Sequence, residues 1–262
     1  MLTIIVCMKV VIDPEMPFSE FRIDRERRKP VPPAGVPPVF SPFDENALEC
    51  ALKIKDSVEC RVTVLSMGKM VPKAILQKAL AAGANEAVII EDPEFDNLDP
   101  FSTAQILAAA IRKLEAYDLV FTGRQAADWD SGLVWAGIAE MLDMPAVTIA
   151  RNVKLSEGKA LVERCVWDGI ELIETQLPAL ISFSSEVGEL RGVTVPALIK
   201  AKKREIPKWT RSDVESQKSG LVELKDLYEP ELGNVDLYLV PGDSFVEKGR
   251  NLAKRLVEEG LF

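Results

Sequence analysis

Short apolar segments alternate with helical patterns through the first 183 residues, and this alternation most limits the folds open to the chain. Apolar runs predict buried strands at 2–8, 61–66, 87–90, 119–122, 146–149 and 179–183. Apolar residues at helical spacing predict helices near 44–56, 71–83, 100–115 and 131–142. Such alternation requires right-handed crossovers and a mostly parallel sheet with helices on both faces. We therefore expect an α/β fold whose ligands bind beyond the carboxyl ends of the strands.

The pattern changes after residue 150. Segments 152–156, 160–168 and 169–175 alternate around two glycine turns, which predicts a β-hairpin region inserted at about 151–177. We expect the α/β domain to span 1–187. Little regular periodicity follows residue 205, until apolar residues at helical spacing predict a closing helix over 244–261. An arm such as 205–262 buries little against itself, so we expect it to wrap a partner.

The segment 188–204 joins these two parts. Its apolar residues Leu190, Val193, Val195 and Leu198 stand among glycines and a proline, and we expect them to be exposed and to contact another protein. A loop packed on its own core is an equally common alternative. The basic run 200–211 is most simply a solvated charged face.

The chain contains no histidine, and this excludes several chemistries. Ser-His-Asp catalysis, Cys-His catalysis and His-ligated metal sites all need imidazole. The carboxylates are scattered without a pair suited to acid–base work. We therefore predict no catalytic residue and no metal site, and expect a cofactor to carry any reaction.

Charge and cysteine content limit the partners and the compartment. The net charge of −9 argues against nucleic acid as a partner. No apolar run approaches the roughly 18 residues that cross a bilayer, and the first residues lack a basic leader, so we expect no membrane insertion. The four cysteines are far apart and form no CxxC pair, which fits a reducing cytoplasm. Those cysteines are Cys7, Cys50, Cys60 and Cys165.

Two polar turns lie at predicted strand ends. The strand 119–122 runs through Gly123 and a polar turn into a helix start, where free backbone N–H groups favour a bound phosphate. The alternative is that Asp128, Asp130 and Ser131 only cap that helix. In the other turn Ser41 is a candidate N-cap, Pro42 suits the first helical position, and capping also explains Asp44. Neither GxGxxG nor GxxxxGK[ST] occurs, which argues against an NAD-dependent or ATP-cleaving enzyme.

Seven segments along the chain form an ordered set of motifs: VCMKVVID at 6–13, SPFDENAL at 41–48, VLSMG at 64–68, AAGANEA at 81–87, GRQAAD at 123–128, LRGVTVP at 190–196 and KAKK at 200–203. In these segments, and over nearly its whole length, the chain resembles the beta subunit family of electron transfer flavoproteins. The resemblance implies a fold like that of the adenine nucleotide alpha hydrolases. It also implies a heterodimer with an alpha subunit that holds most of a FAD.

Such a dimer carries electrons from a flavin-dependent dehydrogenase, of the acyl-CoA dehydrogenase type, to a membrane quinone oxidoreductase or another acceptor. By resemblance the beta subunit binds a nucleotide itself, either AMP or a second FAD. The implied contacts are Cys7, Ser41, Pro42, Phe43, Asp44, Met67, Gly123, Arg124, Gln125, Ala126, Ala127, Asp128, Trp129, Asp130, Ser131, Gly132, Leu133 and Val134. The dehydrogenase would dock on Leu190, Arg191, Val193, Val195 and Leu198, with Val195 as the apolar anchor, and the arm would embrace the alpha subunit.

The phosphate turn departs from the family pattern. The family commonly reads DGDTxQV or DDDxNQT there, whereas this chain reads DWDSGLV at 128–134. Leu133 replaces an amide side chain expected to reach phosphate. This change points away from a firm diphosphate site, whereas GRQAAD and the Asp-Ser-Gly spacing resemble sequences that include bifurcating members. Two alternatives to an ordinary carrier stay open: an electron-bifurcating subunit that oxidises NADH at a second FAD, and a non-redox nucleotide-binding stress-response module.

Overall fold

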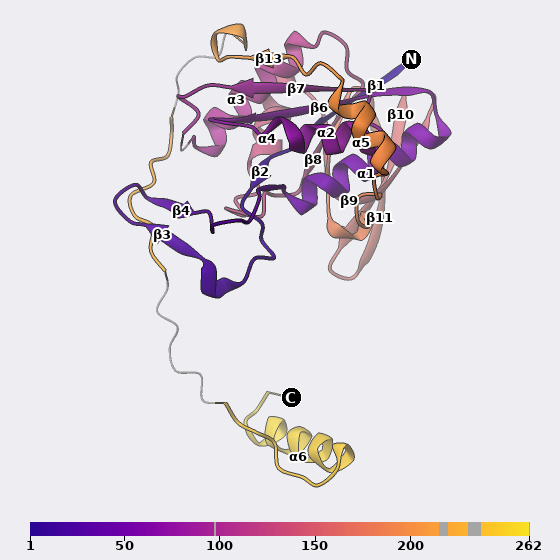
Figure 1. Ribbon diagram of the computed structural model, residues 1–262. Coiled ribbons are helices and arrows are strands. Elements are labelled where there is room, and N and C mark those ends of the chain that lie inside the picture. The colour runs from indigo at the N-terminus through magenta and orange to yellow at the C-terminus, as the bar shows by residue number, and fades with distance from the viewer. Residues whose placement is uncertain (97, 215–219, 230–236, 262) are drawn as a thin grey trace. The chain divides into compact units, whose positions relative to one another are not determined.

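The computed structural model describes residues 1–96, 98–214, 220–229 and 237–261 (Figure 1). Nine strands form one sheet in the order β11-β10-β9-β12-β8-β1-β6-β7-β13. All neighbouring pairs are parallel except β9–β10 and β10–β11. This confirms the predicted, mostly parallel sheet. The strands are β1 (Leu2–Cys7), β6 (Cys60–Gly68), β7 (Glu86–Glu91), β8 (Leu119–Gly123), β9 (Ala146–Ser156), β10 (Lys159–Val166), β11 (Gly169–Gln176), β12 (Ala179–Phe183) and β13 (Lys208–Trp209).

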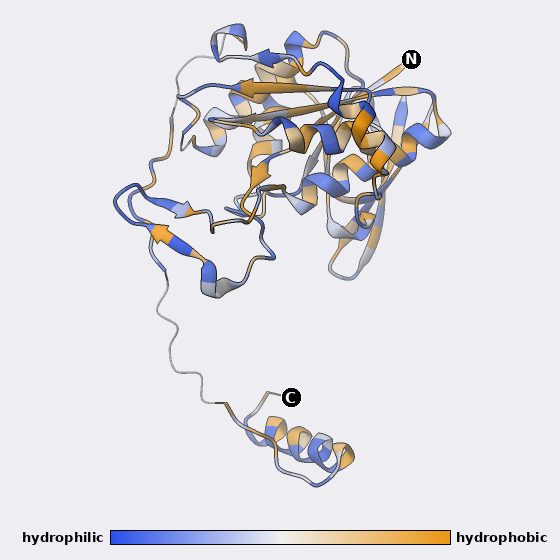
Figure 2. Cartoon of the chain, viewed as in Figure 1, coloured by the Kyte–Doolittle hydropathy of each residue, from blue (hydrophilic) through white to orange (hydrophobic). Residues whose placement is uncertain are grey.

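Helices cover both faces of the sheet, as predicted. On one face, residues of α1 (Pro42–Ser57), α2 (Lys73–Ala82) and α5 (Val195–Lys202) pack in one core cluster with inward residues of the strands. On the other face, α3 (Pro100–Lys113) and α4 (Val134–Leu142) form the second cluster. Apolar residues concentrate in the central strands between these layers (Figure 2). Strands buried on both faces need such continuous apolar sequence.

The predicted inward stripe of α1 is confirmed. Ala47, Leu48, Ala51 and Leu52 are at most 1% exposed. They recur at the i, i+4 spacing that places side chains on one helix face.

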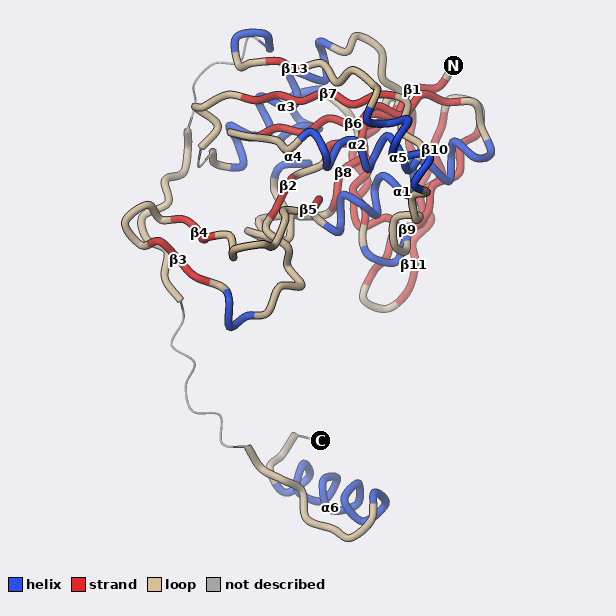
Figure 3. The backbone as a smooth tube through the Cα atoms, in the orientation of Figure 1, coloured by secondary structure: helices blue, strands red, loops and turns tan. Residues whose placement is uncertain are grey.

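Strand order places a switch point at the centre of the sheet. From β1 the chain runs to β6 and β7 on one side, and then returns to β8 and β12 on the other side of β1. Figure 3 shows these strands alternating with helices along the chain. The carboxyl ends of β1 and β8 are therefore adjacent, while their following loops diverge. In open α/β sheets this is where ligands bind.

The predicted hairpin region joins the main sheet instead of leaving it. The core strand predicted at 146–149 and the hairpin strand predicted at 152–156 are one strand, β9. Ile149 has a φ of 56° there, and the pairing of β9 with β12 shifts register between Ile181 and Phe183. A local irregularity of this kind lets one strand bend without ending. Strands β10 and β11 then extend the same sheet as antiparallel strands.

A further insertion separates β1 from α1. It contains β2 (Val10–Val11), a 3-10 turn η1 (Phe18–Glu20), β3 (Arg22–Asp24), β4 (Lys29–Val31) and β5 (Val39–Phe40). The β3–β4 turn contacts residues far along the chain, because the Arg28 guanidinium donates to the Leu224 carbonyl. Asp99 also holds this later segment: it caps α3 through Ser102 N–H and accepts N–H groups of Leu221 and Val222 at 2.6 and 2.9 Å.

The chain divides into two compact units, 1–227 and 228–262. The second unit contains α6 (Phe245–Glu258), which confirms the predicted closing helix. Ser244 caps α6 by accepting the Glu247 N–H at 3.2 Å. The helix buries none of its residues, and Phe245, Val246 and Val257 are exposed. No helix among the described residues is long and apolar enough to span a membrane.

Candidate functional site

One buried carboxylate joins the two loops at the switch point. Asp44, near the start of α1, accepts the Lys9 N–H at its Oδ2 and the Gly123 N–H at its Oδ1, both at 2.8 Å. Lys9 follows β1, and Gly123 ends β8. Asp44 is 6% exposed. Each carboxyl oxygen accepts one backbone N–H, so Asp44 fixes the carboxyl ends of two neighbouring strands relative to α1.

The surroundings of Asp44 shift its ionisation. Burial raises the pKa of Asp44 to about 7, while the N–H groups of Lys9 and Gly123 and the Lys9 charge oppose that rise. Asp128 adds a small further increase. Burial also raises the pKa of the neighbouring Cys7 thiol, and the Asp44 charge raises it further. Cys7 therefore contributes a neutral wall and no nucleophile to this edge of the sheet.

Further contacts bind the loop after β8 to the start of α1. Ser41 is fully buried, and its Oγ accepts the Ala127 N–H at 3.2 Å. The Arg124 guanidinium lies over the Phe43 ring, 4.5 Å from its centroid. The Lys9 ammonium pairs with Asp128 at 2.7 Å. Residues 41–44 and 123–128 are thus held together although about 80 positions separate them.

The capping interpretation of these polar turns is wrong. Ser41 occupies the N-cap position of α1, but its side chain caps no N–H of that helix. Asp44 holds Lys9 and Gly123 instead, and only Pro42 has its predicted role at the first turn. Tertiary partners compete with the helix end for the same side-chain oxygens, and here the partners on other loops win.

The second turn departs from capping in the same way. Helix α4 begins at Val134, three residues later than predicted, and its N-cap position is Leu133, with no side-chain cap. Asp128 pairs with Lys9, while Asp130 accepts the Gln125 amide at 2.8 Å. The first N–H groups of α4 are therefore free of side-chain caps, the condition that an anion site at a helix start needs.

Several buried polar atoms at this edge have no partner. Among the described residues, Thr122 Oγ1, Arg124 Nε and Ser66 Oγ are buried without a hydrogen bond. Thr122 and Ser66 lie near the carboxyl ends of β8 and β6. Buried polar groups nearly always have a hydrogen-bond partner, so three unpaired atoms at one edge of the sheet need an explanation. Their position at the carboxyl ends of the strands is consistent with a ligand.

Gly123 lacks room for any side chain. A Cβ built there lies 2.6 Å from Asp44 Oδ1 and 2.7 Å from Phe43 Cβ. The backbone of β8 therefore meets the start of α1 at the closest possible approach. Gly132 has a different role, because its φ of 60° turns the chain toward α4.

The structure brings the implied nucleotide contacts to one edge of the sheet. Segments 41–44 and 123–134 lie with Cys7 at the switch point, and Met67, half-buried, lies near the end of the adjacent strand β6. Trp129 and Leu133 are 49% and 59% exposed, so neither fills the core. Sequence reasoning missed Lys9 and Thr122. Their positions directly after β1 and near the end of β8 are the signal that could have indicated them.

The segment 188–204 is less exposed than predicted. Leu190 and Val193 pack against the core, and Leu198 is half-buried, so the expected exposure is wrong for these three. Val195 is 69% exposed, as expected. Leu198 is half-buried because it belongs to α5, an unpredicted helix that Thr194 caps through the Ala197 N–H and that packs on α2.

Arg191 fixes this segment to α1. Its guanidinium donates to both carboxyl oxygens of Glu49, at 3.0 to 3.3 Å, and to Asp56 at 2.8 Å. Glu49 is 5% exposed and also accepts the Arg191 N–H. The two acids raise the pKa of Arg191, while Arg191 lowers the pKa of Asp56. Sequence reasoning missed Glu49 and Asp56. Their i, i+7 spacing on one face of α1 is a weak signal for such a pair.

Metal binding has no support in the described part of the chain. Those residues contain no group of three or more cysteine, aspartate or glutamate side chains that could hold a metal ion. The four cysteines are free thiols, three of them buried.

Comparisons with known proteins agree with the residue resemblance. Residues 33–214 match the electron transfer flavoprotein domain. The chain is 39% identical over 221 residues to the electron transfer flavoprotein subunit beta of Thermoanaerobacterium thermosaccharolyticum, which covers 84% of this chain and 83% of that one. The Clostridium acetobutylicum subunit beta matches with the same identity and coverage.

A third relative carries a more specific name. The caffeyl-CoA reductase-Etf complex subunit CarD of Acetobacterium woodii is 38% identical over 212 residues, covering 80% of this chain and 79% of that one. The matched domain includes segments 41–44 and 123–134 as well as α5. The chain therefore belongs to the electron transfer flavoprotein beta subunit family, which implies association with flavin and pairing with an alpha subunit.

Proposed function

We propose that this chain is an electron-carrier subunit that binds an adenine nucleotide at the switch point and shares a FAD with its alpha subunit. One observation carries the nucleotide site: an uncapped helix start and orphaned Thr122 and Arg124 atoms lie beside loops held by Asp44. The N–H groups of α4 would hold phosphate, with Arg124 adding positive charge. The bound flavin supplies the redox chemistry, so the chain needs no catalytic side chain of its own.

The nucleotide is AMP in the first form of this proposal and a second FAD in the other. Leu133 stands where the family usually has an amide side chain that would reach phosphate. Its absence favours AMP, the smaller anion. The uncapped N–H groups of α4 leave backbone donors for a diphosphate, and similarity to a caffeyl-CoA reductase-Etf subunit favours the second FAD. With the second FAD, the chain would take hydride from NADH and belong to a bifurcating complex.

Denaturing the purified heterodimer and quantifying the released nucleotides tests this choice. One FAD and one AMP per dimer support the ordinary carrier. Two FAD support the bifurcating form. A dimer that releases one FAD and no second nucleotide contradicts the proposed site in this chain.

A charge-matched pair of variants tests the site itself. Arg124→Met removes a cation from the edge of the site, and we expect the second nucleotide to be lost at least tenfold faster on dialysis. Arg164→Met removes the same charge from the β10–β11 pair, where Arg164 contacts Glu171 at 3.0 Å, and we expect retention to stay unchanged. Equal loss from both variants argues against a phosphate contact at Arg124.

Two surfaces are proposed for protein partners. Val195 and Ile199, exposed by 69% and 54% on one side of α5, would dock a flavin-dependent dehydrogenase. The arm 205–262 would embrace the alpha subunit, because α6 has an apolar side and no buried residue in this chain. A membrane quinone oxidoreductase is one proposed acceptor. Four free thiols support a reducing, cytoplasmic location.

The non-redox alternative makes a different prediction. A stress-response module of the same fold would form a colourless homodimer that ignores an alpha subunit. Family membership favours the carrier. Co-expression with the alpha subunit, followed by size-exclusion chromatography with detection at flavin wavelengths, distinguishes the two.

A further inference from the structure

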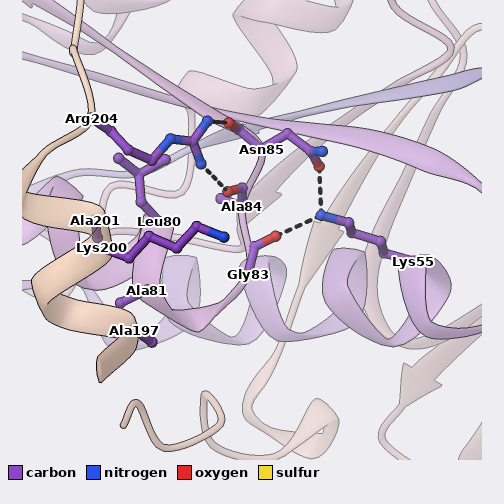
Figure 4. A pocket seen from close by; sticks show the side chains of 10 residues that line it. All are labelled: Lys55, Leu80, Ala81, Gly83, Ala84, Asn85, Ala197, Lys200, Ala201 and Arg204. Carbon is purple, nitrogen blue, oxygen red and sulfur yellow. Dashed lines mark hydrogen bonds between the residues drawn. The ribbon is translucent and has the colours of Figure 1, made fainter. Parts of the chain in front are cut away.

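A pocket lies away from the switch point, between the ends of α1 and α2 and one side of α5. Its volume is about 350 Å³, and Figure 4 shows its lining. Liquid water takes about 30 Å³ per molecule, so the pocket has room for a small organic molecule. The lining residues are Lys55, Leu80, Ala81, Gly83, Ala84, Asn85, Ala197, Lys200, Ala201 and Arg204.

The charged residues that line this pocket all have the same sign. Lys55, Lys200 and Arg204 line it, and no acidic side chain does. This contrasts with the chain as a whole, which carries a net charge of −9. Three cations with no acidic side chain in the same lining attract an anion, most strongly at low ionic strength.

Two of the cations have structural partners. Lys55 donates to the Gly83 carbonyl and to Asn85 Oδ1, both at 2.7 Å, and Arg204 donates to the carbonyls of Ala84 and Asn85 (Figure 4). These two side chains supply hydrogen-bond donors to backbone carbonyls that follow the carboxyl end of α2. An ammonium has three N–H donors and a guanidinium five, so both side chains keep donors to spare.

Lys200 has no such role. Among the described residues no hydrogen bond or ion pair engages its ammonium, and Figure 4 draws none. Its charge adds to those of Lys55 and Arg204 without satisfying a carbonyl. Lys200 is exposed to solvent beside the pocket, so its ammonium is available to a bound oxyanion.

Small apolar side chains line the rest of the pocket. Ala84 and Ala201 are 3% exposed, Leu80 is 7% exposed, and Ala81 and Ala197 leave the space open. A bare inorganic ion would contact only the cations of the lining. An oxyanion on a short apolar group would use both parts of the lining.

We propose that this pocket binds a small organic anion, a carboxylate or phosphate carried on a short apolar chain, with Lys200 as its principal ion-pair partner. The oxyanion would accept hydrogen bonds from Lys200 and from the spare donors of Lys55 and Arg204. The apolar chain would lie against Leu80, Ala84 and Ala201. This proposal does not rest on the nucleotide site, which is on another edge of the fold.

Calorimetric titration of the full-length chain with its alpha subunit, at low ionic strength, tests the proposal with hexanoate, acetate and inorganic phosphate. We expect one saturable hexanoate site per chain. Hexanoate has four methylenes more than acetate, and burying two of them should make it bind about tenfold more tightly. Saturable binding of inorganic phosphate would identify the oxyanion contact, whereas equal affinities for acetate and hexanoate would overturn the assignment of an organic anion.

Three variants locate the binding. Lys200→Met should weaken hexanoate at least tenfold, whereas Lys202→Met, with the same charge change on the same helix but outside the pocket, should change it less than twofold. Ala197→Leu should block the pocket without changing charge. Absence of saturable hexanoate binding, or equal weakening by the two lysine variants, would overturn the proposal.

Discussion

Replacing Gly123 by alanine tests the close approach on which the switch-point site depends. The new Cβ would lie 2.6 Å from Asp44 Oδ1, 2.7 Å from Phe43 Cβ and 2.9 Å from the Phe43 carbonyl carbon. Ordinary contact begins near 3.4 Å, so the loops must separate by about 0.8 Å along the shortest contact. Two of the three obstructing atoms belong to the Phe43 backbone or Cβ, which a rotamer change cannot move away.

The magnitude follows from two costs. Overpacking of this kind costs about 1–3 kcal/mol. Separating the loops also weakens the 2.8 Å bond from Gly123 N–H to Asp44, and a hydrogen bond to a charged group contributes about 1.5–3 kcal/mol. We expect the free energy of unfolding to fall by about 3–5 kcal/mol, a large part of the about 5–15 kcal/mol typical of a domain.

Urea unfolding followed by tryptophan fluorescence measures this loss. With an m-value of about 3 kcal/mol/M, the midpoint should fall by roughly 1–1.7 M. Gly192→Ala is the control, because no atom lies within 4 Å of its Cβ position, and its midpoint should not fall. A loss below about 1 kcal/mol in Gly123→Ala would refute the argument that Asp44 and Phe43 clamp this position.

Three further predictions concern Asp44, Arg191 and Gly137. The pKa of Asp44 rises from 3.8 to about 7, so its stabilising contribution is present below pH 4 and is lost as pH rises through 7. Urea titrations should show that the free energy of unfolding of the wild type falls, relative to that of Asp44→Asn, by up to about 4 kcal/mol between pH 4 and pH 8. A difference between the two proteins that stays constant with pH would contradict this. Arg191→Met leaves buried Glu49 unpaired and should cost about 3 kcal/mol by the same assay; adding Glu49→Gln should recover part of it, and no recovery would rule out the charge as the cause. Gly137→Ala places a Cβ 2.6 Å from the Ala104 Cβ and should lower the melting temperature by several degrees, whereas the double variant with Ala104→Gly should restore it.

The fold was largely predictable because burial on two faces leaves a direct mark on sequence. The central strands are continuous apolar runs, and α1 repeats its apolar residues at the helical period, so length and periodicity alone located them. Periodicity failed where elements are short or bent. The two-residue strand β13 pairs with β7 through only Lys208 and Trp209, and β9 bends at Ile149 without a turn sequence.

The candidate site was predictable in location and not in its contacts. Alternation predicts a parallel sheet whose ligands bind beyond the carboxyl ends of the strands, and residues 41–44 and 123–134 lie at that edge. The roles of individual polar residues did not follow. Ser, Asp and Asn near a helix start read as caps from sequence, because only local partners are visible there. Asp44 and Ser41 have partners 79 and 86 positions away, on loops that adopt their positions only in the folded sheet.

The sequence by itself determined the alternation, the family and the absence of histidine chemistry, because these are properties of residue type and spacing. Only the tertiary structure decided that Asp44 clasps two strand ends, that Arg191 neutralises buried Glu49, and that Lys55, Lys200 and Arg204 line one pocket. The physical reason is that a charged side chain is costly to bury and is stabilised by whichever partner the fold brings within about 3 Å. The packing of the sheet and helices sets that distance, and the separation of two residues in the sequence does not predict it.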